Sequence, residues 1–185
     1  MSVFESVPLE RVRAYWDARP CNVRHSPKPV GTRDYFDEVE ARKYRVEPHI
    51  PPFAEFARWR GKRVLEIGCG IGTDTISFAR AGADVTAVDL SPRSLDIARS
   101  RAAVFGLSDR VRFHCADAEN LSSQVPVEPF DLVYSFGVIH HSPHPDRIVA
   151  QLRRYLPPGV RDALANVDVH VCLPPRSRCN GATRA

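Results

Sequence analysis

The stretch VLEIGCGIGTD, from Val64 to Asp74, places three glycines within five residues directly after an aliphatic run. Glycine weakens the interior of a strand or a helix, so this cluster indicates a backbone that bends sharply or lets another molecule approach closely. The aliphatic residues predict a short buried strand, and the following TDTISFARAG predicts a helix that ends at Gly82. The stretch therefore predicts a strand, a bare loop and a helix in succession.

The same alternation continues towards the C-terminus. DVTAVD, RVRFHCAD and FDLVYSF predict three more strands, the second with Val111, Phe113 and Cys115 on one face. SPRSLDIARSRAAVFG predicts a helix that Ser91 caps and Gly106 ends. PDRIVAQLRRYL predicts another helix, with Ile148, Leu152 and Tyr155 facing the sheet. Strands that alternate with helices of this length predict the α/β class, with a Rossmann-like parallel sheet wound by helices.

Residues 1–60 have a different character. They contain seven of the sixteen prolines, and their apolar spacing predicts short helices at LERVRAYW, DYFDEVEARKY and PPFAEFARWR, the second with Phe36, Val39 and Lys43 at helical spacing. We expect three regions: a helical lid over 1–60, a ligand-binding core over 61–159 and an atypical tail over 160–185.

Composition narrows the class of protein. The 185 residues, 43% of them hydrophobic, are enough for one sizeable core, and no apolar stretch approaches the roughly 20 residues of a membrane span. The start of the chain mixes acids with apolar residues, which is atypical of a signal sequence. We expect a soluble cytoplasmic protein without a membrane partner.

Charge and cysteine content point to neither nucleic acid nor metal. The net charge is +4, but Lys and Arg are scattered among acids. The five cysteines show no ligand-like spacing, and their odd number argues against a disulfide framework. We therefore expect free thiols and no metal site.

The glycine loop is the expected ligand site. In a wound parallel sheet, ligands bind at the carboxyl ends of the strands, where backbone N–H groups and a helix N-terminus favour anions. A dinucleotide-binding fingerprint requires glycine where Thr73 stands, and the Gly-Lys-Ser/Thr ending of a phosphate-binding P-loop is absent. Neither of those two ligand classes fits.

Glu66 precedes the first glycine, and the resulting E-x-G-x-G-x-G resembles motif I of the class I S-adenosylmethionine-dependent methyltransferases. VTAVDLS, CADAENL and FDLVYSFGVIHH resemble the next three motifs of that family, in family order, over roughly residues 64–159. YWDARPCNVRHS and EVEARKYRVEPHIPPFAEF are similar to the lid and first helices of bacterial small-molecule methyltransferases of the ubiquinone/menaquinone-biosynthesis type.

The resemblance implies S-adenosylmethionine as cofactor and S-adenosylhomocysteine as product. It implies that Asp89 binds the ribose hydroxyls, that Asp117 receives the adenine amino group, and that Ala118 supplies a backbone contact. The cofactor contacts that it implies are Glu66, Gly68, Cys69, Gly70, Gly72, Asp89, Leu90, Asp117, Ala118 and Ser135. Asp74 is expected to cap the following helix instead.

Methyl transfer is an in-line displacement that depends mainly on positioning. Aromatic faces favour cations, and of the aromatic residues in the lid we expect Tyr15 and Tyr44, with Trp16 beside them, to cover the cofactor; core packing is the alternative. His140, and next His141, are the candidate general bases, with a purely structural role as the alternative.

The sequence departs from the family pattern after the last predicted helix. Pro157 and Val160 replace the usual Lys and Gly, and 26 residues remain after Gly159. We expect an incomplete C-terminal half in which ANVDVHVCL forms one strand, with Val167, Val169, Val171 and Leu173 on one face, and the rest is disordered. A shortened sheet leaves an exposed edge, so we expect either a homodimer through that edge or a marginally stable protein.

The leading interpretation is an enzyme that methylates a small molecule. A first alternative is a non-catalytic homologue that binds S-adenosylmethionine without turning it over. A second alternative is an RNA methyltransferase that uses the Arg-rich N-terminal region, but the fourth-strand loop lacks the Asn/Asp-Pro-Pro-Tyr signature of many base methylases.

Overall fold

One parallel sheet organises the molecule. The computed structural model describes residues 7–157 and the backbone of residues 169–172. The sheet has five parallel strands in the order β3-β2-β1-β4-β5. The strands are β1 (Arg63–Ile67), β2 (Asp84–Asp89), β3 (Val111–Cys115), β4 (Leu132–Phe136) and β5 (Val169–Cys172). The predicted α/β architecture is confirmed, and the chain reverses its direction of winding between β1 and β4.

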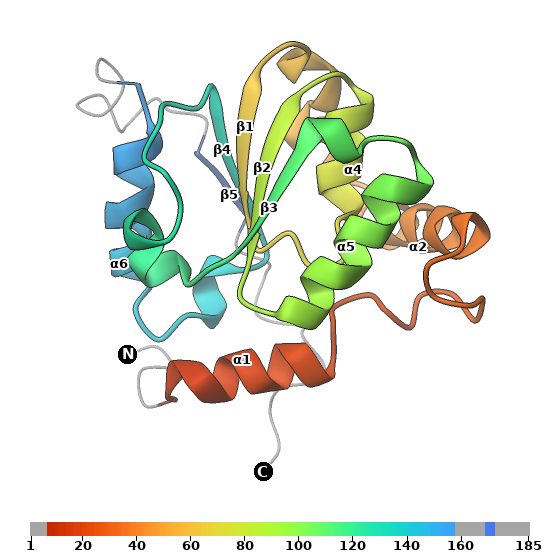
Figure 1. Cartoon of the computed structure of the whole chain (residues 1–185), viewed down its shortest axis with the longest axis horizontal. Coiled ribbons are helices and arrows are strands. Elements are labelled where there is room, and N and C mark those ends of the chain that lie inside the picture. The colour runs from red at the N-terminus through yellow and green to blue at the C-terminus, as the bar shows by residue number, and fades with distance from the viewer. Residues whose placement is uncertain (1–6, 158–168, 173–185) are drawn as a thin grey trace.

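Helices cover both faces of the sheet (Figure 1). On one side lie α2 (Arg33–Val46), α4 (Thr73–Arg80) and α5 (Pro92–Val104), and on the other lies α6 (Pro145–Leu152). A hydrophobic core lies on each face of the sheet, and successive residues of β1 belong to different cores. Val64 packs in the core on the α4 side, and Leu65 packs in the core on the α6 side. As predicted, Ile148 and Leu152 of α6 are buried against the sheet.

Helix α1 (Leu9–Ala18) crosses the carboxyl edge of the sheet (Figure 1). None of its residues is fully buried. Its last turn is tied to the start of α5, because Asp17 Oδ1 accepts hydrogen bonds from Ser91 Oγ and from Arg93 N, both at 2.9 Å. Ser91 also accepts from Ser94 N, which confirms its predicted role as the cap of α5.

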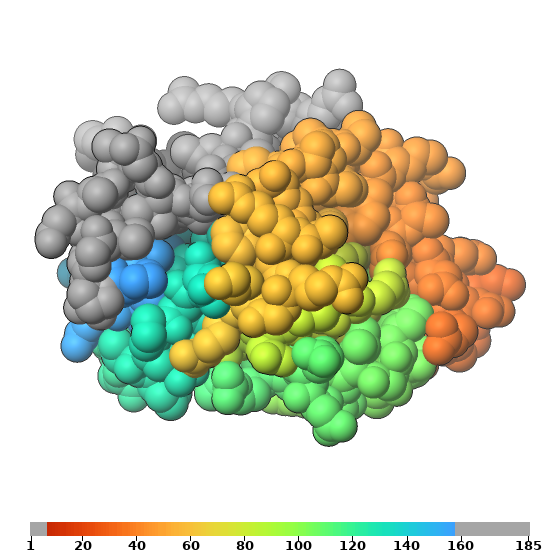
Figure 2. Space-filling model, turned by 90° about the horizontal axis from the view of Figure 1, so that it is seen from above, coloured from red at the N-terminus to blue at the C-terminus, as the bar shows by residue number. Residues whose placement is uncertain are grey.

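One local prediction is wrong. The third helix is not continuous: α3 (Ile50–Ala54) gives way to the 3-10 turn η1 (Phe56–Trp59), because Glu55 adopts a left-handed conformation with φ 46°. These residues lead into β1 and form the amber surface across the middle of the amino edge in Figure 2. In β3 (Val111–Cys115) the residues at positions 111, 113 and 115 alternate along the strand as predicted; Val111 is buried, Phe113 is half-buried and Cys115, at the end of the strand, is exposed.

Four further 3-10 turns connect the elements: η2 (Ser108–Arg110), η3 (Ala118–Ser123), η4 (Ile139–His141) and η5 (Arg153–Tyr155). The strand predicted in ANVDVHVCL is present as β5, so β4 is not a sheet edge. Val167, Leu173 and the rest of the predicted tail lie outside the described residues. Within the described ranges, no helix is long and apolar enough to cross a membrane.

Candidate functional site

The glycine loop joins β1 to α4 in a conformation that larger residues rarely adopt. Gly68 and Gly70 have φ of 75° and 53°. A Cβ on Gly68 would overlap the side chain of Val138, whereas a Cβ on Gly70 would meet no atom within 4 Å. Gly68 N donates to Val88 O at 2.7 Å, which holds the start of the loop against β2. The loop therefore presents bare main chain to the open space beside it.

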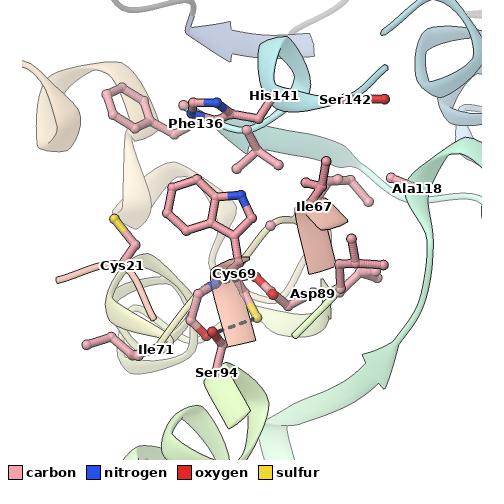
Figure 3. Close-up of a pocket in the computed structure, with 18 of the residues that line it drawn as sticks. Cys21, Ile67, Cys69, Ile71, Asp89, Ser94, Ala118, Phe136, His141 and Ser142 are labelled. Atoms are coloured by element: carbon pink, nitrogen blue, oxygen red, sulfur yellow. Dashed lines mark hydrogen bonds between the residues drawn. The ribbon is translucent and has the colours of Figure 1, made fainter. Parts of the chain in front are cut away.

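That space is a cavity of about 330 Å³ between the loop, the strand ends and α1. Figure 3 shows Phe136 and His141 on one side of it, and Cys69, Asp89 and Ser94 on the other. Of the predicted contacts it is lined by Gly68, Cys69, Gly70, Asp89, Leu90, Asp117, Ala118, Trp16 and His141. The structure thus brings residues from four separate sequence motifs and from α1 to one cavity.

Asp89 ends β2 and is held in place by the main chain. Its Oδ2 accepts from Gly70 N at 2.8 Å and its Oδ1 accepts from Ser91 N at 2.9 Å. Burial raises the pKa of the Asp89 carboxyl, although these backbone donors oppose that effect. Each carboxylate oxygen has a second lone pair, so Asp89 can still accept hydrogen bonds from a ligand with hydroxyl groups.

Asp117 and Ala118 follow β3 at the neighbouring position of the same edge. Asp117 Oδ1 accepts from Glu119 N at 2.8 Å, so this carboxylate caps the turn that Ala118 begins. Burial raises the pKa of the Asp117 carboxyl. The capping role and a ligand contact are compatible, because the other oxygen stays available.

Three residues predicted to contact the cofactor are not among those that line the cavity. Glu66 lies beneath the loop, where its Oε2 accepts from Thr75 Oγ1 at 2.5 Å. Burial, with the Asp74 charge second, raises the pKa of Glu66 to about 8. Ser135 is buried and donates to Ile67 O, and Gly72 serves as the N-cap of α4. These three residues support the loop from behind.

Asp74 is not the predicted cap, since the N-cap position belongs to Gly72 and no side chain caps the helix. Its carboxylate is instead the centre of a buried network. It accepts from Tyr44 OH at 3.1 Å and from Tyr134 OH at 2.9 Å, and it pairs with Lys43 Nζ at 2.8 Å. The network ties α2, α4 and β4 together.

The aromatic residues expected in the lid separate into two groups. Trp16 lines the cavity from α1, and Tyr15 packs edge-on against it with 5.1 Å between ring centroids. Tyr15 and Tyr44 do not line the cavity. Tyr44 turns its hydroxyl towards Asp74 and Ser77 instead. Of the three, the structure brings Trp16 alone to the site.

The two histidines also differ. His141 lines the cavity, whereas His140 does not. The His141 ring lies 4.0 Å from that of His140 and 5.3 Å from Trp16. Burial, with the His140 charge second, lowers the pKa of His141 to about 4, so its imidazole is neutral near pH 7. The sequence favoured His140 as the candidate base, but His141 is the histidine that lines the cavity.

Several lining residues escaped the sequence reasoning. Lys43 and Glu47 reach the cavity from the end of α2, and Cys21 and Asn22 from the loop after α1. The sequence contained one indication of the position of Lys43, because this lysine shares a predicted helix face with the apolar residues Phe36 and Val39. The loop residues gave no signal, because their position depends on how α1 packs. Among the described residues no cluster of three or more potential ligands for a metal ion occurs.

Comparison with known proteins gives a consistent result. The family described as "Methyltransferase domain" matches residues 64–159. Methyltransferase GfsG of Streptomyces halstedii is 36% identical over 114 residues, which are 61% of this chain and 40% of that protein. The ubiquinone biosynthesis O-methyltransferase of Aromatoleum aromaticum is 41% identical over 99 residues, 54% of this chain and 41% of that protein.

Among solved structures, magnesium protoporphyrin IX methyltransferase of Synechocystis PCC 6803, with bound SAM, matches with a TM-score of 0.58. The sequences are 21% identical, and the match covers 80% of this chain and 71% of that one. This likeness is one of fold. The chain spans about two fifths of the length of the two curated relatives.

Proposed function

Because the chain belongs to the methyltransferase domain family, we propose that it transfers a methyl group from S-adenosylmethionine to a small-molecule acceptor. The observation that carries this proposal is the joint lining of one cavity by the bare glycine loop and by Asp89 and Asp117. S-adenosylmethionine supplies an electrophilic methyl group on a sulfonium. The residues of the protein hold the donor and the acceptor in the orientation that transfer requires.

The residues at the site fit this cofactor. Asp89, anchored by two main-chain donors, accepts from the vicinal ribose hydroxyls, and Asp117 accepts from the adenine amino group. Leu90 and Ala118 provide an apolar surface for the base. The open side of Gly70 lets the nucleoside lie against the main chain. Glu66 and Ser135 act indirectly, by holding the loop.

Catalysis in this arrangement rests on orientation and on exclusion of water. Helix α1, with Trp16 facing the cavity, acts as the lid, and residues 1–60 form the substrate region beside the core of residues 61–159. His141 is the candidate base, since its neutral imidazole can accept a proton from an acceptor hydroxyl. A pKa near 4 makes it a weak base, so positioning remains the larger contribution.

Partners follow from the same geometry. An acceptor must enter a mostly apolar cavity, which favours a small molecule over a nucleic acid. A homodimer through the outer edge of β5 is the proposed oligomer, because an edge strand offers unpaired backbone groups. Light scattering that finds only monomer would contradict the dimer without affecting the activity.

Calorimetry tests the cofactor assignment. We expect S-adenosylmethionine and S-adenosylhomocysteine to bind and NAD not to bind. Asp89→Asn, which keeps the shape but loses the charge, should weaken both by about 10- to 100-fold, as for the loss of hydrogen bonds to a charged group. The matched control is Asp84→Asn at the other end of β2, where the carboxylate pairs with Arg110 at the surface.

Turnover separates an enzyme from a binding homologue. Incubation with S-adenosylmethionine and a panel of small hydroxylated acceptors should yield S-adenosylhomocysteine and a product 14 mass units heavier, roughly one methylene, by mass spectrometry. Tight binding without S-adenosylhomocysteine across the panel would favour the non-catalytic alternative. Failure to bind either nucleoside, or binding of NAD, would contradict the proposal itself.

A further inference from the structure

A second cavity lies beside the proposed adenine site, and the ribose and adenine contacts described above do not use it. It has a volume of about 240 Å³. About 10–15 Å³ of such space is enough for one water molecule, so this cavity has room for a group of several heavy atoms. Its polar lining consists of Glu10 and Arg13 from α1, and of Cys115, Asp117 and Gln124 from the end of β3 and the turn that follows.

The two cavities are direct neighbours. Leu9, Leu90, Ala116 and Asp117 line both of them. In the proposed complex the adenine lies against Leu90 and its amino group is bound by Asp117. The amino group is therefore the part of the donor that lies closest to the second cavity.

Two hydrogen-bond donors face the second cavity. Arg13 is exposed on α1, and its guanidinium carries five N–H groups. Gln124 Oε1 accepts from Asp117 N at 3.2 Å, so the amide N–H groups are the part of this side chain that can bind a ligand. Both residues suit a ligand group that accepts hydrogen bonds.

The charges around the second cavity favour a neutral acceptor group. The carboxylates of Glu10 and Asp117 line it together with the single cation of Arg13. A carboxylate on the ligand is repelled by two of these groups and attracted by one. A carbonyl oxygen accepts from the same donors without that repulsion.

The adenine amino group can carry a substituent without losing Asp117. The group has two N–H bonds. Asp117 Oδ1 already accepts from Glu119 N at 2.8 Å, so its other oxygen accepts one N–H from the ligand. Replacement of the second hydrogen keeps that bond and directs the substituent away from Asp117.

We propose that the second cavity binds a short substituent on the adenine amino group of the methyl donor, one with a neutral carbonyl that accepts hydrogen bonds from Arg13 and Gln124. This assignment rests on the proposed function. It widens the class of ligands to adenosyl compounds that carry a single substituent on N6.

Calorimetry with four forms of S-adenosylhomocysteine tests the assignment: the parent compound and its N6-carbamoylmethyl, N6-carboxymethyl and N6,N6-dimethyl derivatives. The carbamoylmethyl compound should bind within about threefold of the parent, because its new hydrogen bonds offset the cost of ordering the substituent. The carboxymethyl compound, of nearly the same shape, should bind more weakly than the carbamoylmethyl compound. The dimethyl compound leaves Asp117 without a donor and should bind about tenfold or more weakly than the parent.

A pair of arginine variants separates the second cavity from the rest of α1. Arg13→Met should weaken the carbamoylmethyl compound by about fivefold, as for one lost hydrogen bond, and leave the parent within about twofold. Arg11→Met is the matched control, because Arg11 is exposed on the same helix and lines neither cavity. It should leave both affinities unchanged.

Cys115 provides a readout that does not depend on affinity. Its thiol is exposed, lines the second cavity and donates to Leu90 O at 3.7 Å. An S-adenosylhomocysteine whose N6 substituent ends in a chloroacetamide should alkylate it: the sulfur bonds to the chlorine-bearing carbon, chloride leaves and the thiol proton passes to solvent. Peptide mapping by mass spectrometry should place the adduct on Cys115, and excess parent compound should prevent its formation.

Two controls define this labelling. Cys115→Ser should remove the adduct. Cys21 is also exposed, but it lines the main cavity on the side opposite Ala118 (Figure 3). An adduct on Cys21 would mean that the substituent leaves the site in the opposite direction.

The outcomes distinguish the assignment from the proposed function. If the wild-type protein binds none of the four compounds, the proposed function fails and the assignment fails with it. If the parent binds, the function stands, and three results overturn the assignment: carbamoylmethyl binding as weak as that of the dimethyl compound, equal losses in the Arg13 and Arg11 variants, or no protectable adduct on Cys115. Carboxymethyl binding as tight as carbamoylmethyl binding would overturn the choice of a neutral group.

Discussion

Glu66 lies outside the lining of the cavity and supports the glycine loop from beneath. Its carboxyl is buried beneath the glycine loop and accepts a hydrogen bond from Thr75. Asp74, Asp89 and Lys43 are the charged groups that act on it, and burial dominates their combined effect. The pKa of about 8 means that Glu66 carries its proton near neutral pH, so the loop rests on a neutral group.

This protonation makes stability depend on pH. The folded-state pKa of about 8 lies above the ordinary value of 4.5, so the folded chain binds the extra proton between these limits. The resulting stabilisation is complete below pH 4.5, the ordinary pKa, and is lost as the pH rises through 8. The raised pKa values of Asp89 and Asp117 add a change of the same sign.

Glu66→Gln removes the titrating group and keeps its shape. We therefore expect the free energy of unfolding of wild type to fall, relative to that of the variant, between pH 5 and pH 8 by more than about 1.4 kcal/mol, the value of one pKa unit. Urea titrations at several pH values measure this difference. Parallel pH profiles for the two proteins would show that Glu66 titrates near its ordinary value.

At the scale of elements, α1 is attached to the rest of the molecule mainly at its end. Asp17 is the polar anchor: its Oδ1 accepts from Ser91 Oγ and Arg93 N at the start of α5. The Arg93 backbone bond, then the Ser91 bond, lowers the pKa of Asp17. A carboxylate at a helix N-terminus is favoured by the helix dipole. Since α1 also lines the cavity, we expect this anchor to set how readily the proposed lid opens.

Asp17→Ala should loosen α1 without damaging the core. Amide hydrogen exchange over residues 9–18 is expected to accelerate by about threefold or more, because local opening loses two hydrogen bonds. Dissociation of S-adenosylhomocysteine, followed by stopped flow, should accelerate in parallel. Glu10→Gln in the first turn of α1 is the control. Unchanged exchange in the Asp17 variant would mean that apolar contacts alone hold the helix.

The sequence predicted those elements whose signals are local. Short patterns of residue type predicted four features: the glycine loop, the Ser91 cap, the buried face of α6 and the strand β5. What escaped prediction depends on packing between distant segments. The position of Asp74 in the sequence predicts a helix cap. In the structure its carboxylate is buried, where it binds Lys43, Tyr44 and Tyr134.

The same distinction applies within the site. Asp89 and Asp117 were predictable, because the ends of neighbouring parallel strands necessarily meet at one edge. The choice of His141 over His140, and of Trp16 over Tyr15 and Tyr44, was not. Adjacent residues of a 3-10 turn or a helix point in different directions, and the packing of η4, α1 and α2 against the rest of the molecule decides which of them reaches the cavity.

At the scale of the whole molecule, Arg101 joins the N-terminal region to the core. It is fully buried in α5, and its guanidinium donates to Thr73 Oγ1 at 2.8 Å, to Phe36 O at 3.2 Å and to Glu40 Oε2 at 3.0 Å. One side chain thus connects α2, α5 and the first residue of α4, directly behind the glycine loop. The proposed boundary near residue 60 divides the substrate region from the cofactor-binding core. The hydrogen bonds of Arg101 to Phe36 and Glu40 cross that boundary.

Such a contact predicts that residues 1–60 and the core unfold together. Both tryptophans, Trp16 and Trp59, lie in the N-terminal region, so their fluorescence reports on that region while circular dichroism reports on the whole chain. We expect the two urea transitions of the wild-type protein to coincide. Arg101→Met should lower the free energy of unfolding by about 3 kcal/mol, because it removes the buried donor of Thr73 Oγ1 and Phe36 O. Glu40 keeps its ion pair with Arg80. Arg99→Met, which removes an exposed pair with Asp96 on the same helix, should cost less than about 1 kcal/mol. In the wild-type protein, a fluorescence transition at a much lower urea concentration than the dichroism transition would mean that residues 1–60 unfold as a separate unit. Arg101 would then stabilise the packing of α5 without joining the two regions.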